Sequence, residues 1–125
     1  MADYEFLKLE RRDAVARLTL DRPQRRNALT HGMMLELEDV FARLRADAGC
    51  RVLVLRGAGG HFCAGGDLDA MAAMPPEPAD GARDPLVAAY RQFGNARLAL
   101  DALPQAPISV VEGSAVGGGF GMACC

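Results

Sequence analysis

The 125-residue sequence lacks several features that would indicate other classes of protein. Lys8 is its only lysine, which excludes any site that needs a second one, and no GxxxxGK(S/T) phosphate-binding loop is present. The net charge of -2 gives no basic surface of the kind that binds nucleic acid. We therefore expect no nucleic-acid partner.

Long hydrophobic runs are also missing. Charges or glycines interrupt every apolar stretch before it reaches the roughly 18–20 residues that a membrane span needs. The opening residues, MADYEFLKLERRD, are charged and alternating, unlike a signal peptide. We therefore expect no membrane partner and a cytoplasmic location, and the composition of 50% apolar and 24% charged residues indicates a globular fold.

The four cysteines show no recognisable pairing pattern. Cys50, Cys63, Cys124 and Cys125 form neither a CxxC motif nor a Cys/His spacing. The adjacent Cys124 and Cys125 are poorly placed to bond to each other or to share one metal ion. We expect free thiols and no metal site, with a disulfide or a metal site as the alternative.

Hydrophobic periodicity predicts alternating strands and helices. Residues 4–20 alternate around a turn at 11–13, which indicates a β-hairpin, and Thr30 is placed to cap a helix. Residues 75–85 hold four prolines and predict a mobile loop. The predicted helices span residues 30–46, 68–74 and 85–103, and the predicted buried strands span 52–55 and 108–111. This order predicts an α/β fold in a single domain over residues 1–125.

Two glycine corners, Gly65-Gly66 and Gly117-Gly118-Gly119, each follow an apolar strand and precede a helix. N–H groups at the start of a helix lack internal acceptors, and glycine lets a ligand approach the backbone closely. Two such corners that converge on one point would make an oxyanion hole. Taken singly, a glycine cluster more often marks a tight turn. Neither corner fits GxGxxG, which disfavours a Rossmann-type nucleotide-binding domain.

Three segments carry a family resemblance: DRPQRRNALT, VLVLRGAGGHFCAGGDLDAM and PISVVEGSAVGGGFGMAC. In this order and spacing they resemble the RPxxxNAL, GxGxxFxAGxDL and P-x-(apolar)-G-x-A-x-GGG motifs of the enoyl-CoA hydratase/isomerase (crotonase) superfamily. The resemblance covers nearly the whole chain. It implies a spiral of β-β-α units, a coenzyme A thioester as the substrate and no permanently bound cofactor. It also implies a homotrimer, or a dimer of trimers, for full-length relatives.

The resemblance also assigns roles to individual residues. It implies that the N–H groups of Gly66 and Gly118 bind the thioester oxygen and stabilise its enolate form. Arg25 and Arg26 either attract the CoA phosphates or belong to a solvated loop. The implied substrate and CoA contacts are Gln24, Arg26, Ala28, Ala64, Asp67, Leu68, Val116 and Gly121.

Other conspicuous residues favour structural roles. His61 precedes the first glycine corner, where a structural role is favoured over a catalytic one, and His31 falls in the exposed first turn of a helix. Glu112 is expected to make a local hydrogen bond, and Ser114 has no GxSxG context for a nucleophile. The methionines are expected in the core or a pocket lining, namely Met33, Met34, Met71 and Met74.

Two departures from the family limit the functional prediction. Hydratases of the family typically carry a glutamate two residues after GGG, where this chain has Gly121, which cannot serve as an acid or base. Members without this glutamate include isomerases. The GGGFGMAC run, with a DPL-containing helix before it, is also similar to isohexenylglutaconyl-CoA hydratases of terpene catabolism.

The second departure is length, because family members are longer and place a second glutamate beyond the range of this sequence. We therefore expect an N-terminal half, with exposed apolar surface and with weak or no activity of its own. The predicted chemistry is hydration or isomerisation of a 2-enoyl-CoA. The alternative is a non-catalytic CoA-binding remnant or one half of a split enzyme.

Overall fold

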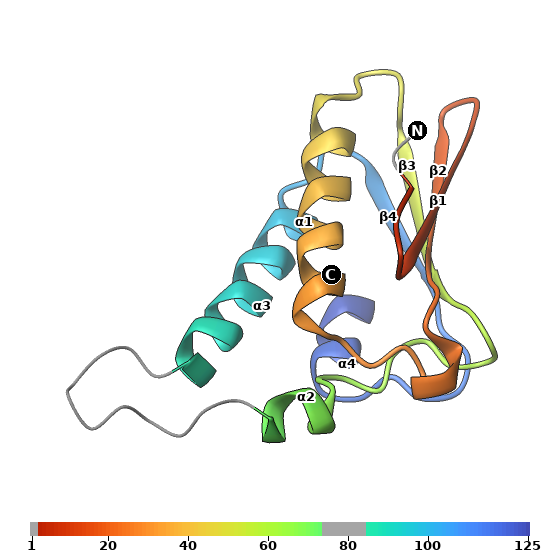
Figure 1. Cartoon of the computed structure of the whole chain (residues 1–125). Coiled ribbons are helices and arrows are strands. Elements are labelled where there is room, and N and C mark those ends of the chain that lie inside the picture. The colour runs from red at the N-terminus through yellow and green to blue at the C-terminus, as the bar shows by residue number, and fades with distance from the viewer. Residues whose placement is uncertain (1–2, 74–84) are drawn as a thin grey trace.

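The computed structural model describes residues 3–73 and 85–125, which form a sheet with helices packed on one of its faces (Figure 1). The element order alternates strands and helices, and the predicted α/β fold is confirmed. The mobile loop predicted at 75–85 lies outside the described residues, except for Pro85, which begins a helix.

Four strands form one sheet in the order β1-β2-β3-β4. Strand β1 (Leu7–Arg12) runs antiparallel to β2 (Val15–Leu20), as the predicted hairpin requires. Strands β3 (Val52–Gly57) and β4 (Ala106–Val110) continue the sheet in parallel.

The hairpin turn was predicted two residues too early. Arg11 pairs with Ala16 and Arg12 pairs with Val15, so both arginines belong to β1. The turn is made by Asp13, whose φ of 52° lies in the left-handed region, and by the residue after it. Aspartate tolerates this conformation better than most side chains, because its short polar group bonds locally.

Helix α1 (His31–Ala46) begins as predicted, because the Thr30 hydroxyl accepts a hydrogen bond of 3.3 Å from the Met33 N–H. A single 3₁₀ turn, η1 (Pro23–Arg25), precedes it. The remaining helices are α2 (Leu68–Ala72), α3 (Pro85–Asp101) and α4 (Gly118–Ala123).

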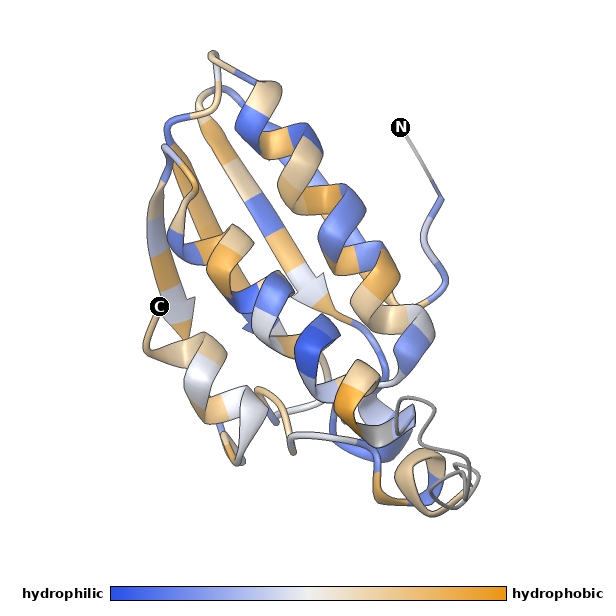
Figure 2. Cartoon of the chain, turned by 90° about the vertical axis from the view of Figure 1, so that its left-hand side faces the viewer, coloured by the Kyte–Doolittle hydropathy of each residue, from blue (hydrophilic) through white to orange (hydrophobic). Residues whose placement is uncertain are grey.

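The core lies between the sheet and the helices α1 and α3, which pack against each other (Figure 2). Every second residue of β2 and β3 faces this layer, as the pleat of a strand dictates. The core side chains of the strands include Leu18, Leu20, Leu53 and Leu55, and those of α1 are Met33, Met34, Leu37, Val40, Phe41 and Leu44.

The opposite face of the sheet is open in the part of the chain that the structure describes (Figure 1). Val54 pairs with Ile108 on this face, and Ile108 and Val110 are 50% and 41% exposed. The prediction of a buried strand at 108–111 was therefore wrong in burial and two residues late at its start. An apolar run predicts a strand with two covered faces, but β4 is an edge strand of this sheet and all its residues except the half-buried Ser109 are exposed.

Candidate functional site

The two glycine corners meet because the loop of residues 63–66 pairs with a neighbouring loop on each side. An isolated parallel bridge joins Leu29 to Gly66, and a second joins Cys63 to Ala115. The segment around Gly65-Gly66 thus lies between the chain that enters α1 and the chain that leaves β4. Segments far apart in sequence reach one site in this way.

The corners are close enough that only glycine fits at some positions. A Cβ on Gly119 would come 2.4 Å from the carbonyl oxygen of Cys63, and one on Gly65 would come 2.8 Å from that of Val116. Gly65 and Gly117 also have positive φ values, 90° and 55°. The glycines are therefore needed both for the close approach of the two corners and for the backbone conformation of the turns.

The N–H groups of Gly66 and Gly118 find no hydrogen-bond acceptor within residues 3–73 and 85–125. Gly118 is the first residue of α4, where the N–H has no acceptor inside the helix. Its neighbour Gly119, in contrast, donates to the carbonyl of Val116 at 2.9 Å. The first corner therefore keeps the Gly66 N–H available for a ligand, and the second corner keeps that of Gly118.

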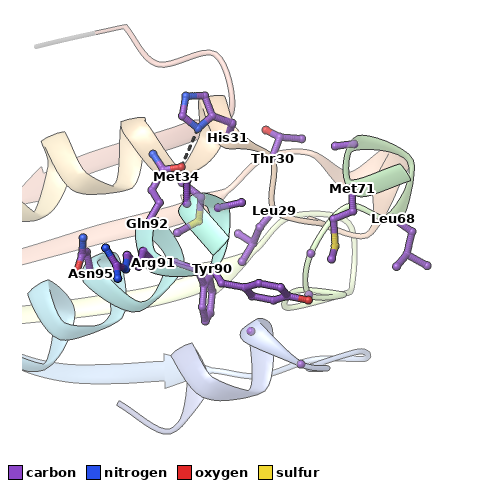
Figure 3. Close-up of a pocket in the computed structure, with 18 of the residues that line it drawn as sticks. Leu29, Thr30, His31, Met34, Leu68, Met71, Tyr90, Arg91, Gln92 and Asn95 are labelled. Atoms are coloured by element: carbon purple, nitrogen blue, oxygen red, sulfur yellow. Dashed lines mark hydrogen bonds between the residues drawn. The ribbon is translucent and has the colours of Figure 1, made fainter. Parts of the chain in front are cut away.

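Both donors line a cavity of about 1140 Å³ between the start of α1, the helices α2 and α3, and the two corners (Figure 3). Its side chains near the corners are mostly apolar, namely Leu29, Met34, Leu68, Met71, Tyr90, Phe93 and Val116. The polar side chains that line the cavity are Thr30, His31, Glu38, Arg91, Gln92 and Asn95.

The structure gathers part of the predicted site at this cavity. The predicted residues that line it are Gly66, Gly118, Ala64, Leu68 and Val116. The predicted residues outside its lining are Gln24, Arg26, Ala28, Asp67 and Gly121. Gln24 and Arg26 are exposed around η1, and Ala28 is buried. A Cβ on Gly121 would meet only the Arg97 side chain, at 3.9 Å, so this position faces α3.

Asp67 holds the first corner in place. Its side chain is buried and accepts hydrogen bonds from the Ala70 N–H at 2.8 Å and from Arg22 Nη1 at 2.7 Å. These bonds, the Ala70 N–H first, hold the pKa of the carboxyl below its usual range. Arg22 also donates to the Ala28 carbonyl at 3.0 Å. The ion pair joins the loop before α1 to the corner, and sequence reasoning missed it.

Asn27 is a second supporting residue that sequence reasoning missed. Its side chain is fully buried, accepts from the Arg22 N–H at 2.8 Å, and donates to the carbonyls of Ala58 at 3.0 Å and His61 at 2.7 Å. The amide therefore ties the RPQRRNAL segment to the loop that follows β3. Its position in the RPQRRNAL segment was the feature of the sequence that could have indicated this supporting role.

The histidines fit the roles favoured from sequence, whereas the hydrogen bond at Glu112 is made by its backbone carbonyl and not by its side chain. His61 Nδ1 accepts from the Ser114 N–H at 3.0 Å, so this ring joins two loops. The ring of His31 is exposed and bonds to Gln92 at 2.7 Å (Figure 3). The carbonyl of Glu112 accepts from the Phe62 N–H.

The methionines also lie where expected. Met33 and Met34 are buried, and Met71 lines the cavity. Met74 lies outside the described residues.

The cysteines are all free thiols, as expected. Burial raises the pKa of the Cys63 thiol to about 11, and its Sγ donates to the Asn27 carbonyl at 3.1 Å. Cys63 is therefore a packing residue rather than a nucleophile.

Within the described ranges, no three His, Cys, Asp or Glu side chains gather to hold a metal ion. None of the helices described is long and apolar enough to cross a membrane.

The sequence profile of the enoyl-CoA hydratase/isomerase family matches residues 10–125. This chain belongs to that family. Among curated members, it is 35% identical over 123 residues to the probable enoyl-CoA hydratase EchA14 of Mycobacterium tuberculosis, covering 98% of this chain and 45% of that protein. It is 38% identical over 117 residues to the enoyl-CoA hydratase EchA19 of the same species, covering 89% and 40%.

Solved structures of the enoyl-CoA hydratase/isomerase family share the fold. The chain superposes on Pseudomonas aeruginosa AtuE with a TM-score of 0.87 and 45% identity, covering 96% of this chain and 45% of that one. For the enoyl-CoA hydratase/isomerase from Marinobacter aquaeolei the TM-score is 0.88 and the identity 40%, covering 96% and 46%. The chain thus has the crotonase fold over a length that is less than half of these relatives.

Proposed function

We propose that the chain forms the N-terminal half of an acyl-CoA enzyme that holds the thioester oxygen of a 2-enoyl-CoA between the N–H groups of Gly66 and Gly118. The observation that carries this proposal is the meeting of two unpaired backbone donors at one cavity. Donors fixed by the fold stabilise a developing negative charge without reorganising as it forms.

The chemistry that fits this site passes through a thioester enolate. When water adds to the β-carbon of the enoyl group, or when a proton leaves the acyl chain, negative charge accumulates on the thioester oxygen. Hydrogen bonds from Gly66 and Gly118 lower the energy of that state. A thioester seated against the apolar side chains near the corners would displace water from these bonds, which strengthens them. Hydration and isomerisation of a 2-enoyl-CoA share this intermediate.

The nucleotide end of CoA is assigned to the exposed segment before α1. Arg25 pairs with Asp69 at 3.0 Å, whereas Arg26 has no ion-pair partner in the described part of the chain. An exposed guanidinium suits a phosphate group because it presents several N–H donors. Gln24 lies beside it. Ala28 and Asp67 are buried, and both accept hydrogen bonds from Arg22, which holds this segment against the first corner.

The cavity side of the ligand is assigned to Ala64, Leu68 and Val116. All three line the cavity, and Leu68 and Val116 are 78% and 58% exposed, so apolar surface is available to the pantetheine arm or the acyl group. Gly121 is the remaining predicted contact. Without a carboxylate it offers only its backbone, so the acid or base must come from another residue.

A second candidate is a CoA-binding chain without turnover, either a remnant or one half of a split enzyme. Gly121 in place of a carboxylate favours it. This candidate shares the thioester site and differs only in the chemical step.

Calorimetric titration of the 125-residue chain tests the proposal with three ligands: a 2-enoyl-CoA, a CoA thioether of equal length and free CoA. The thioether lacks the carbonyl oxygen, so we expect it to bind about tenfold more weakly than the thioester, as lost hydrogen bonds require. Equal affinity of thioether and thioester would contradict the donor pair. Hydration measured by loss of the conjugated absorbance then separates the candidates, since the second predicts binding without turnover.

A further inference from the structure

Each proposed donor has one side chain seated against its α-carbon. A Cβ on Gly118 would come 2.5 Å from two ring carbons of Phe93, and a Cβ on Gly66 would come 3.1 Å from the Met71 sulfur. Phe93 belongs to α3 and Met71 to α2, so the two helices bound the space in front of the donors. The acyl carbons of a bound thioester must occupy this space.

Tyr90 is the other aromatic side chain in this space. It precedes Phe93 by three residues on α3, which places both on the same side of the helix. Figure 3 shows its ring extending from α3 into the cavity, beneath Leu29 and toward Met71. The side chain is 59% exposed, so much of its ring surface is available for a ligand.

We propose that Tyr90 is a specificity-determining residue whose ring stacks on the acyl group and selects a flat, conjugated thioester. This inference rests on the proposed function, because it takes the carbonyl position from Gly66 and Gly118. A 2-enoyl thioester is planar through its C=C and C=O bonds, and aromatic rings favour offset contact with such a surface. A saturated chain is tetrahedral at the same carbons and meets the ring with fewer atoms.

The tyrosine content of the chain supplies a direct reporter. It has two tyrosines and no tryptophan, and Tyr4 bonds to Asp39 on α1 and does not line the cavity. In a Tyr4→Phe background, Tyr90 is the only strong fluorophore. We expect its emission to change when a 2-enoyl-CoA binds and to stay constant with free CoA, after correction for adenine absorbance.

Three variants then separate the ring from its hydroxyl. Calorimetry with a 2-enoyl-CoA and with the saturated acyl-CoA of equal length gives the preference for the conjugated ligand. We expect Tyr90→Phe to keep that preference and Tyr90→Leu to reduce enoyl-CoA affinity roughly fivefold, with little change for the saturated ligand. Phe120→Leu is the matched control, because Phe120 is 62% exposed and lies outside the cavity lining.

The outcomes separate this inference from the proposed function. An unchanged enoyl preference in Tyr90→Leu overturns the inference while thioester binding stands, and an equal loss in Tyr90→Phe assigns the effect to the hydroxyl and also overturns it. If no thioester binds to the wild-type chain, the proposed function and this inference fail together. Unfolding curves of all three variants are expected to match the wild type, because both side chains are largely exposed.

Discussion

The ring of Phe93 lies against the α-carbon of Gly118, so that a Cβ at this glycine would come 2.5 Å from the Cε2 and Cζ atoms of the ring. The contact joins α3 to the first residue of α4, which lines the cavity. Gly118 thus combines two requirements, a free backbone donor and no side chain. The position of this donor depends on how α3 is packed.

Substitution of Gly118 by alanine is expected to move α3 and α4 apart. We expect acyl-CoA affinity to fall at least tenfold, because the donor leaves its place, and the free energy of unfolding to fall by about 1–3 kcal/mol, as for other overpacked sites. The double variant with Phe93→Leu relieves the clash and is expected to recover part of the loss. Calorimetry measures the acyl-CoA affinity of both variants, and urea unfolding measures their stability. Unchanged binding in Gly118→Ala alone would contradict the contact between Phe93 and Gly118.

Gly119 and Gly121 form a matched pair on the same helix. A Cβ at Gly119 meets the Cys63 carbonyl at 2.4 Å, and backbone cannot move aside cheaply, whereas at Gly121 the nearest atom is 3.9 Å away. We expect Gly119→Ala to destabilise the chain by about 2–3 kcal/mol. Gly121→Ala is expected to be neutral, or to stabilise by about 0.5–1 kcal/mol, because alanine favours a helix. Denaturant unfolding measures both, and similar losses would refute the close approach of the corners.

Asp67→Asn tests the buried ion pair with Arg22. Losing one partner leaves the other charge buried, so we expect a loss of about 3 kcal/mol in unfolding free energy. Asp69→Asn is the control, because Asp69 and its partner Arg25 are 75% and 54% exposed and such pairs contribute about 1 kcal/mol or less. If the two variants lose the same stability, the Arg22–Asp67 pair does not hold the corner.

The same carboxylate gives a pH dependence of defined sign. Because the pKa of Asp67 is lower in the folded chain than in the unfolded one, its contribution is complete above the unfolded-state value of about 3.9. That contribution is lost as the pH falls through the lower, folded-state value. We expect the unfolding free energy, measured at a series of pH values, to fall less steeply in this pH range for Asp67→Asn than for the wild type. Parallel curves would contradict the lowered pKa.

The open sheet face is expected to cause self-association. Ile108, Val110 and Val15 are 50%, 41% and 39% exposed on this face, and contiguous apolar surface promotes contact between molecules. We expect Ile108→Lys to reduce apolar-dye binding and the apparent mass in size-exclusion chromatography. Its stability is expected to change by no more than about 0.5 kcal/mol. A wild-type chain that elutes as a monomer and binds no dye would contradict this expectation.

Local patterns in the sequence predicted most of the secondary structure. The apolar spacing of α1 and the cap at Thr30 were readable, because both depend on residues within one or two turns. The alternation of apolar and polar residues predicted the hairpin. Its turn was predicted too early because two adjacent arginines are typical of a turn, whereas here Arg11 pairs with Ala16 and Arg12 with Val15. The burial of β4 depends on what covers the sheet, which its own sequence does not encode.

Gly66 and Gly118 were predicted as the donors and line one cavity, whereas the residues that support the corners were not predicted. The glycine corners between strand and helix indicated where a ligand could approach the backbone, and the family resemblance singled out Gly66 and Gly118. Arg22 and Asp67 are 45 positions apart, and Phe93 meets Gly118 only after α3 has packed. Such contacts between distant segments leave no periodic signal, and only the fold brings them together.

The central claim is that the N–H groups of Gly66 and Gly118 bind the thioester carbonyl. Carbon-13 NMR of a 2-enoyl-CoA labelled at the carbonyl carbon, free and bound to the chain, tests it most directly. Two hydrogen bonds polarise the C=O bond, so we expect a downfield shift of the carbonyl resonance on binding, diminished in Gly118→Ala. A bound thioester whose carbonyl resonance stays at its position in water would show that the two N–H groups do not bind the carbonyl.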